Sequence, residues 1–392
     1  MKFLKNLSEI QFRYSKAILI FAIIVTLFLG FGLSKISMQS DLDKMMPQDL
    51  EVYKISHSIE DNFGGQDASI ILLRVEGTEK NGVYDIRDPR VLKFLVELQE
   101  SLKNEDLVES VQSVGMGFTE NTIPKTLESS RQIFNSIPAY SDFFNKDYSA
   151  TIVMISSDLG GGEEKIKEFE KLIDKKISEI SHPENVEIYI TGTPQIRSMM
   201  LDILASDAVF TFLIAAVIIF LLLILMERSF TKATLVFIPL LFGIIWTLGT
   251  MGWLGIQLSV ATVGIGAMIL GLSVEYGVFI VSRYSEEREN NPSKVALQKA
   301  VSEVGGSILG SGTTTIAGFL ALTTSIMPML RDLGLSLAIG IGFSLIAAVF
   351  VNPSLIILEE NLEHWITERQ HKKVIKKREH HKRRKELDEK NY

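Results

Sequence analysis

Glu275 is the ionisable residue of this sequence whose surroundings point most directly to chemistry. It lies in the apolar segment 258–281, which has no other charged residue, and is followed at once by Tyr276. A carboxyl at such a depth in a membrane costs on the order of 2.5–3.5 kcal/mol on insertion scales, so these groups usually face a bundle interior and mark proton or ion pathways. Because desolvation favours the neutral form of a carboxyl, we expect Glu275 to exchange protons. The alternative is a structural carboxylate that snorkels to the nearby membrane border.

Three consecutive threonines, Thr313, Thr314 and Thr315, lie in another charge-free segment. Hydroxyls at such positions either satisfy backbone carbonyls or form a polar face towards a neighbouring helix. Both interpretations stay open here, the second making these residues polar partners of Glu275. Cysteine is absent, which excludes disulfides, thiolate nucleophiles and Cys-ligated metals. We expect no metal, no cofactor and no enzymatic activity.

Long apolar segments are the elements that would position these residues. Hydrophobic residues make up 46% of the 392 residues although 22% are charged, and charge-free runs collect most of them. Crossing the hydrocarbon core takes about 20 helical residues. The pattern predicts a polytopic α-helical membrane protein with six transmembrane helices, at 17–34, 207–226, 233–252, 258–281, 304–324 and 333–358. It excludes a soluble enzyme, a secreted domain or a nucleic-acid-binding module as the whole chain.

The distribution of Lys and Arg predicts the orientation of these spans. Residues 34–206 hold 18 Lys and Arg against 30 Asp and Glu, whereas 370–385 hold nine against one acid. Basic residues also precede the first span and occupy the connections after the second and fourth. The positive-inside rule then places both termini in the cytoplasm and the loop 35–206 outside the plasma membrane. The residues after the first span do not form a small-x-small cleavage site, so we expect a retained span rather than a signal peptide.

Two cytoplasmic segments carry further expectations. The connection 282–303 mixes apolar and charged residues and is predicted to be an amphipathic helix at the membrane interface. The basic tail 359–392, following the five-span bundle 207–358, is either a solvated charge run or a contact for anionic lipid headgroups.

The outer segment 35–206 alternates between strand and helix periodicity. Strands are predicted at 68–76, 107–114, 150–156 and 186–190, and helices at 88–104 and 162–180. This β-α-β-β-α-β order predicts an α+β, ferredoxin-like sandwich. Residues 115–149 form an insertion with one short helix near 124–137. The apolar stripes are interpreted as core, and His57 and His182 as isolated surface histidines.

The segment 269–288 resembles the fourth-span signature of the resistance-nodulation-division (RND) superfamily, in its MMPL-like branch. There a glycine-rich helix carries an acid-tyrosine pair and ends in Arg-Tyr-x-Glu-Glu, as this chain does at 283–287. Segments 40–47, 191–194 and 227–230 resemble further family motifs around the first and second spans. The resemblance runs in order from about residue 10 to 358.

The resemblance implies a half-size transporter with one repeat, where full-length members carry two, and its bundle also resembles a sterol-sensing domain (SSD). It implies that Glu275 is the proton carrier and Tyr276 its hydrogen-bonding neighbour. The family pattern has Asp at this position, so the longer Glu275 is a departure that retains the carboxyl. Two repeats bring two acid-tyrosine pairs together, which implies a homodimer of this chain with Glu275 near its partner. A trimer is the alternative.

Three functions follow from these observations. The first is a secondary exporter of hydrophobic or amphipathic substrates, lipids above all. An ion gradient would drive it, because no GxxxxGK[ST] motif is present to use nucleotides. H⁺ is the expected ion and Na⁺ the alternative. The second is a non-transporting lipid- or sterol-sensing or scaffold protein, against which the retained carboxyl argues. The third is an accessory of protein secretion, which the surroundings of Glu275 match least. No nucleic-acid partner is expected.

Overall fold

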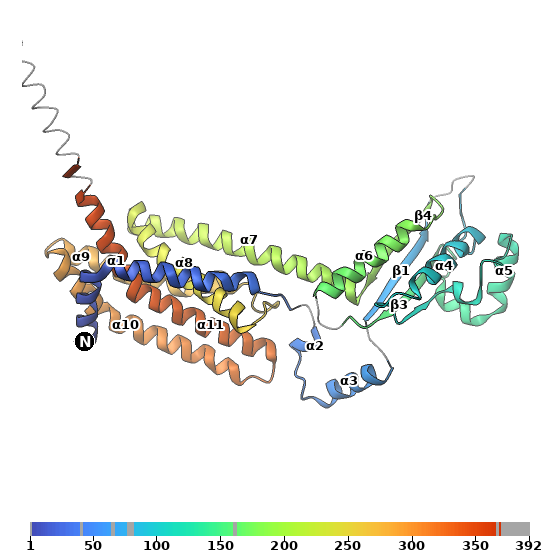
Figure 1. Cartoon of the computed structure of the whole chain (residues 1–392), viewed down its shortest axis with the longest axis horizontal. Helices are drawn as coiled ribbons and strands as arrows, with labels where there is room; N and C mark the ends of the chain where they lie inside the picture. Colours follow the sequence, from blue (N-terminus) through green and yellow to red (C-terminus); the bar gives the residue numbers. More distant parts are fainter. Residues whose placement is uncertain are drawn as a thin grey trace, which may run out of the picture. The chain divides into compact units, whose positions relative to one another are not determined.

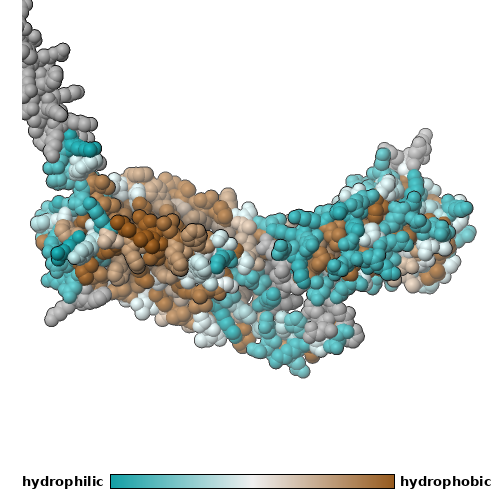
Figure 2. Space-filling view, in the orientation of Figure 1, coloured by the Kyte–Doolittle hydropathy of each residue, from teal (hydrophilic) through white to brown (hydrophobic). Residues whose placement is uncertain are grey.

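The computed structural model divides the chain into two compact units. It describes residues 2–39, 42–63, 67–76, 82–159, 163–365 and 368–369, so most of the basic tail lies outside the described residues. The first unit combines Met1–Ser37 with Asp207–Tyr392, and the second is Met38–Ser206. Apolar side chains gather on the helices of the first unit, whereas hydrophilic ones cover most of the second (Figure 2).

The first unit is a helical bundle (Figure 1). Its elements are α1 (Lys2–Gly30), the 3-10 turn η1 (Phe31–Lys35), the later part of α7 (Thr193–Glu227), α8 (Phe230–Leu254), α9 (Ile265–Arg288), α10 (Ser293–Ala321), the 3-10 turn η4 (Leu322–Thr324) and α11 (Pro328–Ile346), which continues through the π-helix η5 (Ala347–Val351) to residue 365. Both α8 and α10 pack against α1, α9 and α11. The helices that flank α9 are therefore fixed by contacts with one another as well as with α9.

Five helices among the described residues are long and apolar enough to cross a membrane. They run over Leu4–Lys35, Thr193–Glu227, Phe230–Leu254, Ile265–Arg288 and Pro328–Trp365. The helix α10, which contains the predicted fifth span 304–324, is not among them. Its glycines, serines and threonines lower its hydropathy, although it is 29 residues long and packs against three of the five.

Several helix boundaries differ from the sequence prediction, and two of them lie next to Glu275 in the chain. The fourth helix begins at Ile265 rather than at 258, because Thr262 Oγ1 accepts a hydrogen bond from the Ser259 N–H and closes a turn there. The predicted separate amphipathic helix at 282–303 is wrong. α9 runs on to Arg288 and α10 begins at Ser293, and the apolar residues of that segment are mostly buried in the bundle rather than laid on its surface.

The second unit contains a four-stranded antiparallel sheet with the order β2-β3-β1-β4. Its elements are α2 (Leu42–Met45), α3 (Glu51–Phe63), β1 (Asp67–Val75), α4 (Pro89–Leu102), β2 (Ser110–Gln112), the 3-10 turn η2 (Val114–Gly117), α5 (Leu127–Ser136), the 3-10 turn η3 (Pro138–Phe143), β3 (Ala150–Ser157), α6 (Glu163–Glu179) and β4 (Val186–Gly192). Alternate residues of β1 and β3, such as Ile71 and Val153, are buried in one core with Phe94 of α4 and Phe169 of α6. This alternation is that of a sheet covered by helices on one face.

A buried ion pair fixes the insertion that precedes β3, where the expected short helix is α5. Asp85 accepts hydrogen bonds from Arg87 at 2.7 and 2.9 Å and from Arg131 of α5 at 2.9 Å. The Arg87 guanidinium also lies 3.5 Å from the centre of the Tyr148 ring. Burial opposes ionisation of Asp85, but the hydrogen bonds from Arg87 and Arg131 outweigh it and hold the pKa of this carboxyl below its ordinary value.

Candidate functional site

Glu275 lies on the exposed face of α9 and not in the interior of the bundle. It belongs to a stripe with Met268, Leu272 and Phe279, which are 44%, 41% and 49% exposed. Residues with these spacings share one side of a helix. The expected interior position is therefore wrong for the single chain, in which the carboxyl stands on an otherwise apolar surface.

The polar neighbour of Glu275 is Ser311 of α10, whose hydroxyl donates to Oε1 over 3.4 Å. This is near the upper limit of a hydrogen bond, so the stabilisation it gives an ionised carboxylate is small. The sequence interpretation missed Ser311. The available signal was its place at the start of the run that continues into Thr313, on a helix expected beside the fourth span.

Tyr276, one residue further along α9, faces the interior of the bundle, where it is 1% exposed. Its hydroxyl lies 3.5 Å from the position that a Cβ on Gly312 of α10 would occupy. Thr315 of α10 is a further polar neighbour of the Tyr276 hydroxyl. The acid and the tyrosine are therefore adjacent in sequence but contact different sides of α10.

The three threonines mainly satisfy their own helix. Thr313 donates to the Leu309 carbonyl at 2.6 Å, and Thr314 and Thr315 donate to the Ser311 carbonyl at 2.8 and 3.0 Å. Of the two interpretations left open, backbone satisfaction describes all three. The polar contact with α9 applies to Thr315 alone, since Thr313 and Thr314 are exposed.

Glycines with open space at the Cβ position occur on the exposed sides of α9 and α10. A Cβ added at Gly271 of α9, or at Gly306, Gly310 or Gly318 of α10, would meet no described atom within 4 Å. Such positions let another helix approach a backbone closely. We call this surface, with Glu275 and Leu272, the open α9–α10 face.

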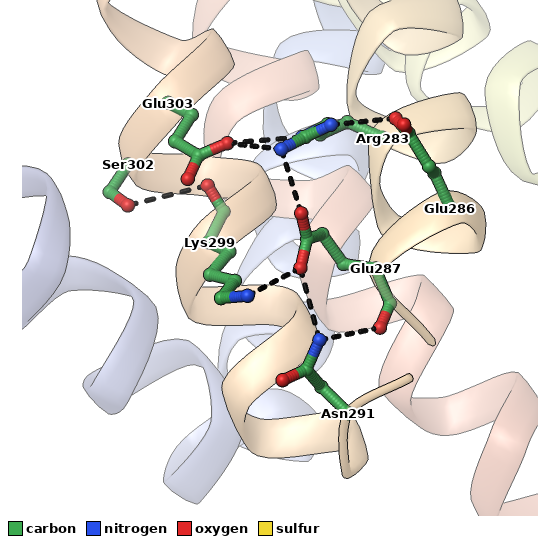
Figure 3. Close-up of polar contacts among 7 residues, drawn as sticks. All are labelled: Arg283, Glu286, Glu287, Asn291, Lys299, Ser302 and Glu303. Carbon is green, nitrogen blue, oxygen red and sulfur yellow. Dashed lines mark hydrogen bonds and ion pairs between the residues drawn. The ribbon is translucent and has the colours of Figure 1, made fainter. Parts of the chain in front are cut away.

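A network of charges ties the end of α9 to the start of α10 (Figure 3). Arg283 lies between Glu286 at 2.7 Å, Glu287 at 2.7 Å and Glu303 of α10 at 2.6 Å. Lys299 of α10 reaches Glu287 at 2.8 Å. The Arg-Tyr-x-Glu-Glu segment, which carries much of the family resemblance, thus serves here as a brace between two helices.

A second cluster extends this brace to the last helix. Glu360 accepts hydrogen bonds from the hydroxyls of Tyr284 and Ser293 and from Arg288 Nε at 2.7 Å. These residues come from α9, the first turn of α10 and the continuation of α11. Three helices are therefore linked at the end of α9 that lies beyond Glu275.

Comparison with known proteins decides the family. The family model described as MMPL family matches residues 44–385. The chain belongs to the MMPL family. A putative membrane protein of Methanocaldococcus jannaschii is 34% identical over 364 residues, which cover 91% of this chain and 94% of that protein. The resemblance seen in the sequence is confirmed, and the chain is a multi-pass membrane protein.

Larger family members match a part of their length. The probable transport protein MmpL9 of Mycobacterium tuberculosis is 30% identical over 50% of this chain and 21% of its own length. The siderophore exporter MmpL5 of the same species is 24% identical over 54% of this chain and 23% of its own length. The chain therefore matches less than a quarter of each of these two transport proteins.

Proposed function

We propose that this chain is a secondary transporter, driven by an ion gradient and coupled to protons, that exports hydrophobic or amphipathic substrates, with lipids as the expected class. The observation that carries the proposal is Glu275, which is the one charged residue in the stretch 265–282 of α9 and lies beside the buried Tyr276. Its relatives MmpL9 and MmpL5 are named as a transport protein and a siderophore exporter. Loss and gain of one proton at Glu275 would change the charge of the open α9–α10 face and thereby its contacts.

We assign the chain six spans, with α10 as the fifth and both termini in the cytoplasm. Contacts of α10 with α1, α9 and α11 support its place in the bundle despite its lower hydropathy. Arg283, Lys299 and Arg288 all lie at one end of α9 and α10, as the positive-inside rule requires of a cytoplasmic end. The outer unit would be a ferredoxin-like sandwich, which its sheet order β2-β3-β1-β4 supports.

We further propose that two copies associate through the open α9–α10 face. In lipid, Glu275 would have one weak polar contact within its own chain, and an unpaired charge at such a place is costly. A two-fold axis near α9 would bring two such carboxyls and their serines together, and the bare glycines of α10 would let the helices come close. The dimer thereby rebuilds the two-repeat arrangement of larger members.

Proton coupling is tested in proteoliposomes with an imposed pH gradient, a pH dye inside and a fluorescent phospholipid as the transport probe. Wild-type protein should move the probe at a rate set by the gradient. Glu275→Gln should abolish this coupling and leave folding intact, because the amide keeps the shape and removes the titrating proton. Glu168→Gln, an exposed residue of α6, is the matched control and should behave as wild type.

Two results would redirect the proposal. Transport by Glu275→Gln at the wild-type rate would remove the proton-carrier role. Gradient-independent retention of the probe by wild-type protein, with no movement across the bilayer, would favour the lipid-sensing alternative.

The dimer is tested by disulfide crosslinking, for which the chain offers a clean background because it has no cysteine of its own. Leu272→Cys on the open α9–α10 face should crosslink between copies. Leu221→Cys on α7, which is 54% exposed, is the control and should not. Equal crosslinking at both positions would mean random collision, and none at 272 would place the interface elsewhere.

A further inference from the structure

The last membrane helix is interrupted by a local break. α11 passes into the π-helix Ala347–Val351, and the Asn352 N–H bonds back to the Ala347 carbonyl. Pro353 follows and has no N–H, so it cannot donate to the Val349 carbonyl four residues earlier. π-helical turns and prolines are the usual places where helices bend.

The Val349 carbonyl takes a hydrogen bond from another helix instead. Gln11 of α1 donates its Nε2 to this oxygen at 2.7 Å, although 338 residues separate the two in sequence. Gln11 is 0% exposed and Val349 is 3% exposed. In such a dry environment the bond is strong, and leaving the carbonyl without a donor is costly.

The orientation of Gln11 follows from this one bond. Only its amide nitrogen can face a carbonyl oxygen favourably, because the amide oxygen would repel it. The remaining atom, Oε1, is buried and finds no partner among the described residues. Gln11 thus holds the Val349 carbonyl through Nε2, while its Oε1 stays without a hydrogen bond to the described residues.

The part of α1 that carries Gln11 is a separate helical segment, residues 2–13. The backbone at Tyr14 is not helical (φ −117°, ψ 27°), and the N-terminal segment bends there (Figure 1). Leu4 packs against Gly305 of α10, and Glu9 forms an ion pair with Lys294 at 3.0 Å. The segment is therefore anchored on α10 while Gln11 reaches across to α11.

The break also touches the helix of the candidate site. Asn352 Nδ2 donates to the Gly277 carbonyl of α9 over 3.4 Å, and its Oδ1 has no partner within the described part of the chain. A Cβ on Gly277 would lie 3.3 Å from this nitrogen, so the contact depends on glycine. Gly277 directly follows Tyr276 and is two positions from Glu275.

We propose that residues 2–13 are a strap on a hinge in α11, and that Gln11 is a positioning residue which keeps the hinge closed. When Gln11 releases Val349, the turn 347–353 can bend and, through Asn352 and Gly277, shift the part of α9 that carries Glu275. The link to substrate movement rests on the transport function proposed above. The hinge and its strap do not.

Hydrogen exchange of the full-length protein, read on peptides covering 343–356, tests the strap in two backgrounds. Gln11→Leu keeps the volume and removes the donor, so exchange of these amides should become about tenfold faster, which corresponds to about 1.4 kcal/mol. Pro353→Ala restores an N–H for Val349, and in that background the same Gln11→Leu change should alter exchange less than about twofold. Ser8→Ala is the matched control, because the Ser8 hydroxyl is buried but bonds within its own helix, to the Lys5 carbonyl.

The outcomes separate the hinge from the function. Equal acceleration by Gln11→Leu in both backgrounds, or none in the wild-type background, would overturn the strap. If Gln11→Leu does not yield folded protein, Pro353→Ala alone still tests the hinge. This variant should slow amide exchange at 347–352, and unchanged exchange there would overturn the hinge. In the proteoliposome assay Pro353→Ala should slow transport without lowering the melting temperature. Failure of wild-type transport with the exchange pattern intact would remove the proposed function and leave the hinge standing.

Discussion

Replacing Gly310 with alanine should leave the single chain intact and weaken its association with a second copy. A Cβ at this position meets no described atom within 4 Å. Alanine in place of glycine within a helix gains about 1 kcal/mol of helix propensity. The isolated protomer should therefore be slightly more stable, by up to this amount. The same methyl group would stand on the open α9–α10 face, where the proposed dimer needs close approach.

Gly249→Ala gives the opposite expectation and serves as the comparison. Its Cβ would lie 2.1 Å from the Leu29 carbonyl oxygen and 2.6 Å from the carbonyl carbon of the neighbouring α1. Backbone atoms cannot rotate aside, so α1 and α8 would have to separate by roughly 1 Å to reach ordinary contact. Overpacking of this kind costs about 1–3 kcal/mol. The two variants should thus differ by about 2–4 kcal/mol in protomer stability, with opposite signs.

Both effects can be read from one detergent preparation. Thermal unfolding followed by tryptophan fluorescence reports protomer stability, since Trp246 is 5% exposed in the bundle core. Particle mass at a series of protein concentrations reports association. The reasoning would be refuted if Gly310→Ala lowered the melting temperature of the monomer as far as Gly249→Ala does. An unchanged dimer fraction in Gly310→Ala would remove Gly310 from the interface.

Three further predictions concern charged residues. Asp85→Asn should destabilise the second unit by about 3–5 kcal/mol, because Arg87 stays buried without its anion. The exposed Lys93→Gln should cost less than about 0.5 kcal/mol in the same thermal unfolding assay. The pKa of Asp85 is depressed in the folded state, so its contribution to the free energy of unfolding is complete above the unfolded-state pKa and is lost as pH falls through the folded pKa. Wild type and Asp85→Asn should therefore converge in stability in acid. Glu287→Gln should speed amide exchange in the turn between α9 and α10, with a smaller difference from wild type in 1 M salt, where screening already weakens the network. Glu275→Asp should retain part of the proton-coupled activity in proteoliposomes, since the carboxyl is kept, and complete loss would show that its reach towards the partner groups is essential.

Local signals in the sequence predicted the four strands of the second unit and its helices α4, α5 and α6, but not α2 and α3. Asp88, which precedes Pro89, is a typical helix-start residue, and it caps α4 by accepting a hydrogen bond from the Arg90 N–H. The strands followed from alternation, since one side of β1 and β3 is buried. Such signals act within a few residues, so a single sequence reveals them.

Contacts between helices were beyond the reach of those signals. A lone carboxyl in an uncharged segment identified Glu275, but the side of α9 on which it stands depends on how α8, α10 and α11 pack around that helix. Ser311 became part of the site for the same reason. Gln11 precedes the first apolar run and looks like an ordinary cytoplasmic residue, because nothing local indicates a bond to Val349.

The packing of α1 has a consequence for synthesis of the protein. Thr26 of α1 accepts a hydrogen bond from Trp246 of α8, and 220 residues separate the two. At translation rates of 5–20 residues per second, α1 waits about 10–40 s in the bilayer before its partner leaves the ribosome. During that time the surface of α1 at Leu29, which later packs against Gly249 of α8, faces lipid or an insertion factor. The high hydropathy of α1 lets it remain in the membrane alone, so this helix is inserted before α8 and packs against it later.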